Sequence, residues 1–209
     1  NANSILNIAS GQAIFVNTAI SRNGVNIAAN NAAFNIGSGA NLIIQQSQHG
    51  FRINNSTASI TNEGTISITL PNGDGIKLLD GSFMNSGMIT IFEAGSDGIE
   101  NNGDFDNNGD IEIEDADRHG IFNGTGSTFT NTADLTITNP GMLTTDGINT
   151  SGTFTNSSSG TITITKMDDD GIGLQEGTFT NDGTINVTVK DAASSGNTGI
   201  SVGTSTLMA

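Results

Sequence analysis

The chain repeats itself every 25 residues or so, and this periodicity limits the fold more than any other feature of the sequence. In each repeat a glycine is followed by an apolar residue, at intervals of 22 to 28 residues with a mean of 25. We call these the column glycines. A regular period of this length is typical of solenoids, in which each repeat packs only against its neighbours. The pairs are Gly24-Val25, Gly50-Phe51, Gly75-Ile76, Gly98-Ile99, Gly120-Ile121, Gly147-Ile148, Gly171-Ile172 and Gly199-Ile200.

Two further sets of equivalent positions divide each repeat into strands. One set holds two apolar residues with one residue between them, as in Ile111/Ile113 and Ile162/Ile164. The other holds Phe, once Ile, and from its second member onward an Asn follows two residues later. Period-2 segments separated by Gly and Asn predict three short strands joined by turns. We expect the Asn side chains to form a ladder at one turn, each amide bonding to the next coil. The Phe set is Phe34, Ile60, Phe83, Phe105, Phe129, Phe154 and Phe179.

The predicted fold is therefore all-β: a single-chain parallel β-helix, that is, a three-sided β-solenoid with about 25 residues per coil, which we expect to be right-handed. Seven to eight coils at a spacing of about 4.8 Å form a rod of about 35–40 Å. A leucine-rich repeat would need more Leu, the G-G-x-G-x-D string of calcium-binding nonapeptides is absent, and a propeller blade needs about forty residues.

The predicted organisation has two parts. Residues 1–23 fit the register poorly and are interpreted as an N-terminal half-coil or cap over an open edge, or alternatively as an upstream coil with looser spacing. Residues 24–209 form the solenoid, whose C-terminal end is open or continues into more coils. The sequence shows no initiator Met and no signal peptide, so we expect a mature or excised segment.

Charge and composition argue against several classes of partner. The chain has 21 acidic and 6 basic residues, a net charge of −15, which repels phosphate backbones and anionic lipid headgroups. No apolar run is long enough to span a bilayer, so we expect neither nucleic-acid binding nor membrane insertion. The absence of cysteine excludes a disulfide framework.

The strings D-G-I, G-T-F-T-N and G-T-I-T-I resemble the β-solenoid passenger and stalk segments of bacterial surface adhesins and autotransporters. The resemblance covers roughly residues 24–200 and concerns architecture and composition. It implies an extracellular or cell-surface location, a rod-like shape and a structural or adhesive role, with surface glycans as partners. The open C-terminal edge also leads us to expect end-to-end self-association into fibres.

The residue before each column glycine carries most of the chemistry. We expect this set, here called the Asp/His column, to stack about 4.8 Å apart along one edge. One interpretation is a cation-binding or acid/base edge, in which His119 lies between Asp97 and Asp146 and its pKa is raised. The interpretation we favour is structural: Asp-Gly and His-Gly form turns where the backbone becomes left-handed. The members are Asn23, His49, Asp74, Asp97, His119, Asp146, Asp170 and Thr198.

Clustered carboxylates raise the question of a metal. Asp168, Asp169 and Asp170 form one acidic group, and a second concentration extends from Glu93 to Asp117. Calcium takes several oxygen ligands, so Asp97, His119, Asp146, Asp168, Asp169 and Asp170 are the candidates for a Ca²⁺ site. No spacing matches a defined calcium loop, and we favour a solvated acidic face and no required cofactor.

Two other functions remain as alternatives to a non-catalytic role. A polysaccharide lyase or hydrolase would need a base near clustered carboxylates, and Arg118-His119-Gly120 is the best constellation for one. No long loops emerge to form the walls of a cleft, so we do not expect an enzyme. An ice-binding solenoid would use outward Thr-x-Thr pairs, which recur at Thr128/Thr130, Thr153/Thr155 and Thr178/Thr180.

Overall fold

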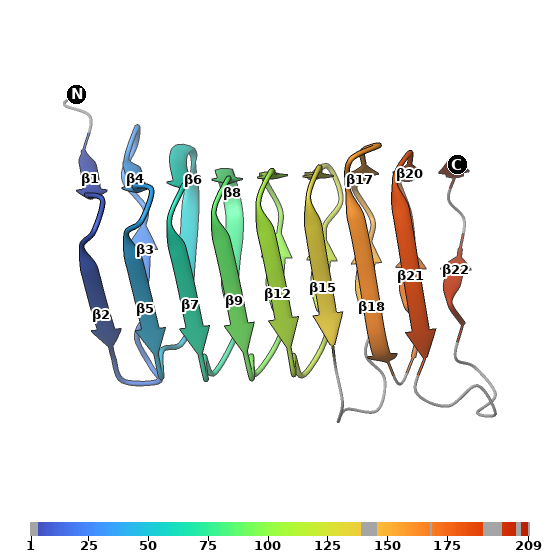
Figure 1. Cartoon of the computed structure of the whole chain (residues 1–209), viewed down its shortest axis with the longest axis horizontal. Coiled ribbons are helices and arrows are strands. Elements are labelled where there is room, and N and C mark those ends of the chain that lie inside the picture. Colours follow the sequence, from blue (N-terminus) through green and yellow to red (C-terminus); the bar gives the residue numbers. More distant parts are fainter. Residues whose placement is uncertain (1–3, 139–145, 168, 190–197, 204–205, 209) are drawn as a thin grey trace.

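Parallel strands wind into a stack of coils along the long axis of the molecule (Figure 1). The structure, a computed structural model, describes residues 4–138, 146–167, 169–189, 198–203 and 206–208. These residues form a β-solenoid of about eight turns with about 24 residues per turn, and none of them is helical. The predicted all-β parallel β-helix is confirmed.

The strands form three stacks, which we call faces 1, 2 and 3. Strands β6 (Phe51–Asn62) and β8 (Ile76–Asn85) are long enough to contribute to both face 1 and face 2. Face 1 also contains β3 (Val25–Ile27), β10 (Ile99–Asn101), β13 (Ile121–Asn123), β16 (Ile148–Thr150), β19 (Ile172–Leu174) and β22 (Ile200–Val202). Face 2 also contains β1 (Ile5–Ile8), β4 (Ala33–Ile36), β11 (Asp104–Asn107), β14 (Thr128–Asn131), β17 (Thr153–Asn156), β20 (Thr178–Asn181) and β23 (Thr206–Met208).

Face 3 is a separate eight-stranded sheet, and its broad arrows form the front layer of Figure 1. Its inward positions carry the paired apolar residues, as in β12, where Ile111 and Ile113 are buried between exposed acids. The strands are β2 (Ala13–Asn17), β5 (Asn41–Gln45), β7 (Thr65–Thr69), β9 (Met88–Phe92), β12 (Asp110–Glu114), β15 (Asp134–Thr138), β18 (Thr161–Met167) and β21 (Thr184–Val189).

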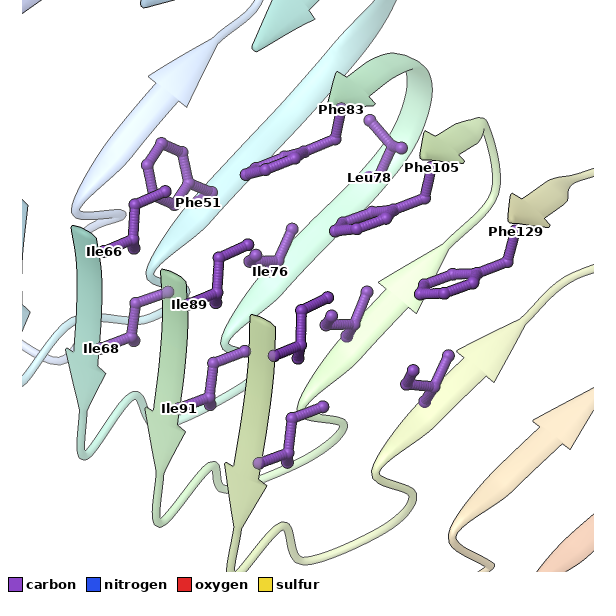
Figure 2. Packing of buried hydrophobic residues seen from close by; sticks show 14 of the residues in the cluster. Phe51, Ile66, Ile68, Ile76, Leu78, Phe83, Ile89, Ile91, Phe105 and Phe129 are labelled. Atoms are coloured by element: carbon purple, nitrogen blue, oxygen red, sulfur yellow. The ribbon is translucent and has the colours of Figure 1, made fainter. Parts of the chain in front are cut away.

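A column of phenylalanine rings runs through the interior. Strand register pairs Phe83 with Phe105 and Phe105 with Phe129, and the ring centroids in both pairs lie 4.8 Å apart with nearly parallel planes. Ile60 interrupts the column, and Phe51 of face 1 compensates by presenting its ring edge to Phe83 at 5.9 Å. Figure 2 shows Phe51 turned away from the stacking direction of the other labelled rings. Stacked aromatic pairs add about 0.5–1.5 kcal/mol each beyond the area that they bury.

A buried ladder of asparagine amides runs beside the phenylalanine column, as predicted. Asn85 Nδ2 donates to Asn107 Oδ1 at 2.8 Å, and Asn107 Nδ2 donates to Asn131 Oδ1 at the same distance. The ladder connects Asn62, Asn85, Asn107, Asn131, Asn156 and Asn181. A shorter ladder, which the sequence analysis did not identify, links Asn101 to Asn123 at 2.8 Å on face 1.

The first 23 residues contribute strands β1 and β2 to the same stack. β1 pairs with β4 and aligns Leu6 with Phe34, while β2 pairs with β5. The side chains of Leu6 and Phe15 are nevertheless 56% and 73% exposed, respectively. Among the described strands, β1 and β2 each pair on one side only.

Candidate functional site: the Asp/His column

The Asp/His column lies at the corner that leads into face 1, and its members are stacked coil upon coil. The backbone N–H of each column glycine from Gly24 to Gly171 donates to the carbonyl of the column member in the next coil. Gly75 N–H, for example, donates to Asp97 at 3.0 Å, and Gly98 N–H donates to His119 at 2.9 Å. The predicted stacking along one edge is confirmed.

The reason for glycine at this corner differs from the predicted one. The column glycines are not among the glycines with positive φ, which are Gly11, Gly39, Gly81, Gly126 and Gly177. The left-handed turn expected for Asp-Gly and His-Gly is therefore wrong. Close approach explains the residue instead, because a Cβ on Gly98 would lie 2.5 Å from Ile113 Cγ2 and 2.6 Å from the Gly120 carbonyl oxygen.

The side chains of the column accept hydrogen bonds from the backbone of the next coil. His49 Nδ1 accepts from Asp74 N–H at 3.0 Å, Asp74 Oδ1 from Asp97 N–H at 3.1 Å, and Asp97 Oδ1 from His119 N–H at 3.1 Å. Farther along, Asp146 Oδ1 accepts from Asp170 N–H, and Asp170 Oδ1 accepts from Thr198 N–H. A short side chain with an acceptor atom suits this position, which explains why Asp and His recur in it.

Two steps of this ladder lack the hydrogen bond, because Asn23 Oδ1 at its start and His119 Nδ1 farther along are each buried without a hydrogen-bond partner among the described residues. The carboxylate oxygen of Asp146 nearest to His119 Nδ1 lies 3.9 Å away. Burial and the positive charge of Arg118 lower the pKa of His119 to about 4. The prediction that this histidine has a raised pKa between two carboxylates is therefore wrong, because burial of the ring outweighs the attraction of Asp97 and Asp146.

The first acidic cluster, formed by Asp74, Asp97 and Glu100, is partly compensated by two cationic side chains of the protein itself. Its carboxylate oxygens lie within 4.8 Å of one another. Lys77 Nζ contacts Asp74 Oδ2 at 3.0 Å and also forms an ion pair with Glu100, while Arg118 lies 3.3 Å from Asp97 Oδ2. Lys77 thus places one positive charge between Asp74 and Glu100.

These contacts shift the titration of the first cluster in opposite directions. Burial alone would raise the pKa of Asp74, but the contact with the His49 ring and the hydrogen bond and positive charge of Lys77 hold that pKa well below its usual range. Burial raises the pKa of Asp97 to about 7 despite the charge of Arg118. Burial of Lys77 lowers its pKa, but the hydrogen bonds and charges of Glu100 and Asp74 outweigh this effect and raise the pKa above its usual value.

The second acidic cluster consists of Asp146, Asp169 and Asp170, whose carboxylate oxygens also lie within 4.8 Å of one another. Burial raises the pKa of Asp146 to about 6, against a 2.6 Å hydrogen bond from Asn149. Burial and the neighbouring Asp170 raise the pKa of Asp169 as well. Oxygen donors in this arrangement are of the kind that Ca²⁺ takes. Asp168 lies outside the described residues.

The predicted site residues therefore do not form a single site. Asp97 groups with Asp74 and Glu100, whereas Asp146 groups with Asp169 and Asp170. Sequence reasoning missed Glu100 and Lys77 as neighbours of Asp74 because they belong to face 1 strands. Lys77 and Glu100 each directly follow a column glycine and its apolar neighbour, and this equivalence could have predicted that the two residues lie side by side.

Two surface hollows lie away from this column. One, of about 290 Å³, is lined mainly by apolar residues of β1, β3 and β4, including Leu6, Val25 and Phe34. The other, of about 260 Å³, lies on face 3 beside Asp110, Glu112 and Asp134. Neither hollow is lined by a member of the Asp/His column, so neither could bring a substrate to the candidate acid/base groups.

Comparison with family models, curated proteins and solved structures found no match to the chain. In the part of the chain that the structure describes, no helix is long and apolar enough to cross a lipid bilayer.

Proposed function

We propose that this β-solenoid is a non-catalytic structural and adhesive segment of an extracellular or cell-surface protein. The single observation that carries the proposal is the use of the Asp/His column within the fold. His49, Asp74 and Asp97 each direct an acceptor atom to the backbone N–H of the following coil. In an enzyme, carboxylate and imidazole groups of this kind would act on a substrate. In this column they hold adjacent coils together.

The proposed mechanism is mechanical and multivalent. Backbone hydrogen bonds, the phenylalanine column and the asparagine ladders join each coil to the next, which favours a stiff rod. Outward positions of faces 2 and 3 carry repeated polar residues, such as Thr130 and Thr155 on adjacent coils. Repetition of one weak contact along a rigid support raises avidity, which suits binding to surface glycans.

The adhesive role is tested by binding and depolymerisation assays run side by side. The purified chain should be retained on immobilised surface polysaccharides and should leave soluble acidic polysaccharides at full length. Depolymerisation that disappears in Asp97→Asn, with an unchanged circular dichroism spectrum, would overturn the non-catalytic assignment. If the chain binds none of the immobilised polysaccharides, glycans are excluded as its partners.

The proposal includes end-to-end self-association. Among the described strands, β3 and β22 each pair on one side only, which leaves backbone donors and acceptors on the other. Exposed apolar side chains accompany these edges: Leu6 at one end, and Ile200 and Val202, which are 38% and 44% exposed, at the other.

Electron microscopy over a concentration series tests self-association. We expect filaments that lengthen with concentration and are suppressed in Leu6→Lys, because an edge lysine disfavours strand pairing. Leu70→Lys is the matched control, since Leu70 is also exposed, at 44%, but lies between coils and not at an end. Short single rods at every concentration would overturn this part of the proposal and leave the adhesive role untouched.

A further inference from the structure

The outward surface of face 3 changes character along the rod. On β12 the outward residues are Asp110, Glu112 and Glu114. On the next three strands, β15, β18 and β21, seven of the nine outward positions are threonine. We call these nine positions the face 3 threonine array: Asp134, Thr136, Thr138, Thr161, Thr163, Thr165, Thr184, Asn186 and Thr188.

Strand register makes the array a regular grid. Thr136 pairs with Thr163, and Thr163 pairs with Asn186, so the residues stand directly above one another on successive strands. Figure 1 shows β15, β18 and β21 side by side in the front layer. The grid therefore has three ranks, one strand spacing apart, and three columns, two residues apart.

The spacing between ranks matches that of hydrogen-bonded water. Two oxygen atoms that bond to one water at about 2.8 Å, with a tetrahedral angle between the bonds, lie about 4.6 Å apart. Neighbouring strands are separated by about 4.7–4.9 Å. A water molecule can therefore bridge hydroxyl groups of adjacent ranks with nearly tetrahedral geometry, as it does in ice.

The hydroxyl groups are available for such bridges. Those of Thr136, Thr161, Thr163 and Thr184 form no hydrogen bond to other described residues, and all four side chains are at least partly exposed. The Thr138 and Thr165 hydroxyls bond directly to each other at 3.0 Å, so this pair is not spaced for a bridging water and the bridges fall to the other positions of the array.

The array offers little to other kinds of partner. It contains no aromatic residue and no arginine, which dominate the binding energy of protein interfaces. Its only charged member is Asp134 at one corner, although the chain carries 21 acidic residues. A grid of hydroxyl and methyl groups with the charges placed elsewhere suits an ordered layer of water.

We propose that the face 3 threonine array is an ice-binding surface. The three columns of face 3 present a broader grid than the two columns that face 2 presents at Thr128/Thr130, Thr153/Thr155 and Thr178/Thr180. The array lies on strands of five to seven residues, whereas those face 2 strands have four. The ice-binding surface is therefore face 3, and this assignment is independent of the adhesive role.

The test uses matched variants on the two faces. Thr163 is at the centre of the face 3 threonine array, and Thr155 holds an outward position on the same coil of face 2. A lysine at either site points to solvent and leaves the core intact, but only Thr163→Lys places a long charged chain across the array. Thermal hysteresis, ice-crystal shape and partition into slowly growing ice are measured for the full chain.

The proposal expects shaped crystals and measurable hysteresis for the wild-type chain, loss of most of both in Thr163→Lys, and retention in Thr155→Lys. Circular dichroism melts check that the variants fold, and Thr136→Lys replaces Thr163→Lys if the latter does not. Absence of hysteresis and of crystal shaping in the wild-type chain overturns ice binding. Loss in Thr155→Lys with retention in Thr163→Lys overturns the assignment to face 3.

Discussion

Replacing Asn107 by alanine should break the asparagine ladder at its most enclosed point. Asn107 is fully buried; its amide donates to Asn131 Oδ1 and accepts from Asn85 Nδ2, both at 2.8 Å. In the variant, the Asn131 oxygen loses the one hydrogen bond it accepts from a described residue. The Asn85 amide keeps weaker contacts of 3.3 and 3.4 Å to two carbonyl oxygens.

The magnitude follows from the group left without a partner. A buried acceptor without a hydrogen bond costs about 1–3 kcal/mol, and loss of the amide volume adds a smaller cavity cost. We therefore expect Asn107→Ala to lower the free energy of unfolding by about 2–4 kcal/mol. This is a large share of the stability of a typical domain.

Asn181 provides the matched control at the end of the ladder. It accepts from Asn156 at 2.7 Å but is partly exposed, and Asn156 Nδ2 keeps contacts to the carbonyls of Gly160 and Thr184. Asn181→Ala should cost about 1 kcal/mol or less, because water can replace the lost bond. The chain has no Trp or Tyr, so urea denaturation is followed by far-ultraviolet circular dichroism. Equal costs for the two variants would refute the account of the ladder as a buried, mutually satisfied network.

Three further predictions concern the corners of the coil. Gly98→Ala should lower the free energy of unfolding by about 1–3 kcal/mol through overpacking. Gly199→Ala should be near neutral, because its Cβ would meet nothing within 4 Å. Similar melting temperatures for the two variants would contradict the close-approach argument. Leu70 directly follows β7 of face 3, has a φ of 55° and is exposed. Leu70→Asn should therefore stabilise the chain by about 1 kcal/mol, and a lower denaturation midpoint would count against strain there. Asp97 and Asp146 have folded-state pKa values raised from 3.8 to about 7 and about 6, so their contribution to stability is complete at low pH and is lost as pH rises through these values. The melting temperature should therefore fall between about pH 4 and pH 7, that is, between the unfolded and the folded pKa values, and Asp97→Asn should flatten the decline; an unchanged slope in the variant would show that Asp97 is not the titrating group.

Local pattern was enough to predict the coils. Residues such as Phe105 and Phe129, or Ile111 and Ile113, recur at fixed places because each coil repeats the same strand and turn geometry. An apolar side chain in an alternating segment has one buried direction available to it, so the strands, their parallel stacking and the asparagine ladder follow from spacing. Composition likewise indicated outward acidic residues, and Glu112 is exposed as expected.

The chemistry of the corner was decided by contacts between coils. Gly98 is explained by the position of Ile113 and of the next coil's carbonyl, and the low pKa of His119 is explained by its burial beside Arg118. Lys77 forms an ion pair with Asp74, three residues earlier in the chain, and a second one with Glu100, because strand register brings β8 and β10 together. Ile113 contacts Gly98 from another strand of the coil, and Lys77 and Glu100 belong to successive coils. Differences of about an ångström decide whether a side chain clashes, bonds or is desolvated.

The face 3 threonine array shows the same division. Alternation predicts that Thr136, Thr163 and Thr184 point outward, as it does for many other polar residues. Only the pairing of β15 with β18 and of β18 with β21 shows that they form three aligned ranks. A residue's direction is a local property of the strand, whereas alignment between strands depends on the length of every turn between them. The sequence therefore determines the coil, and the stacking of the coils determines which surfaces are available for function.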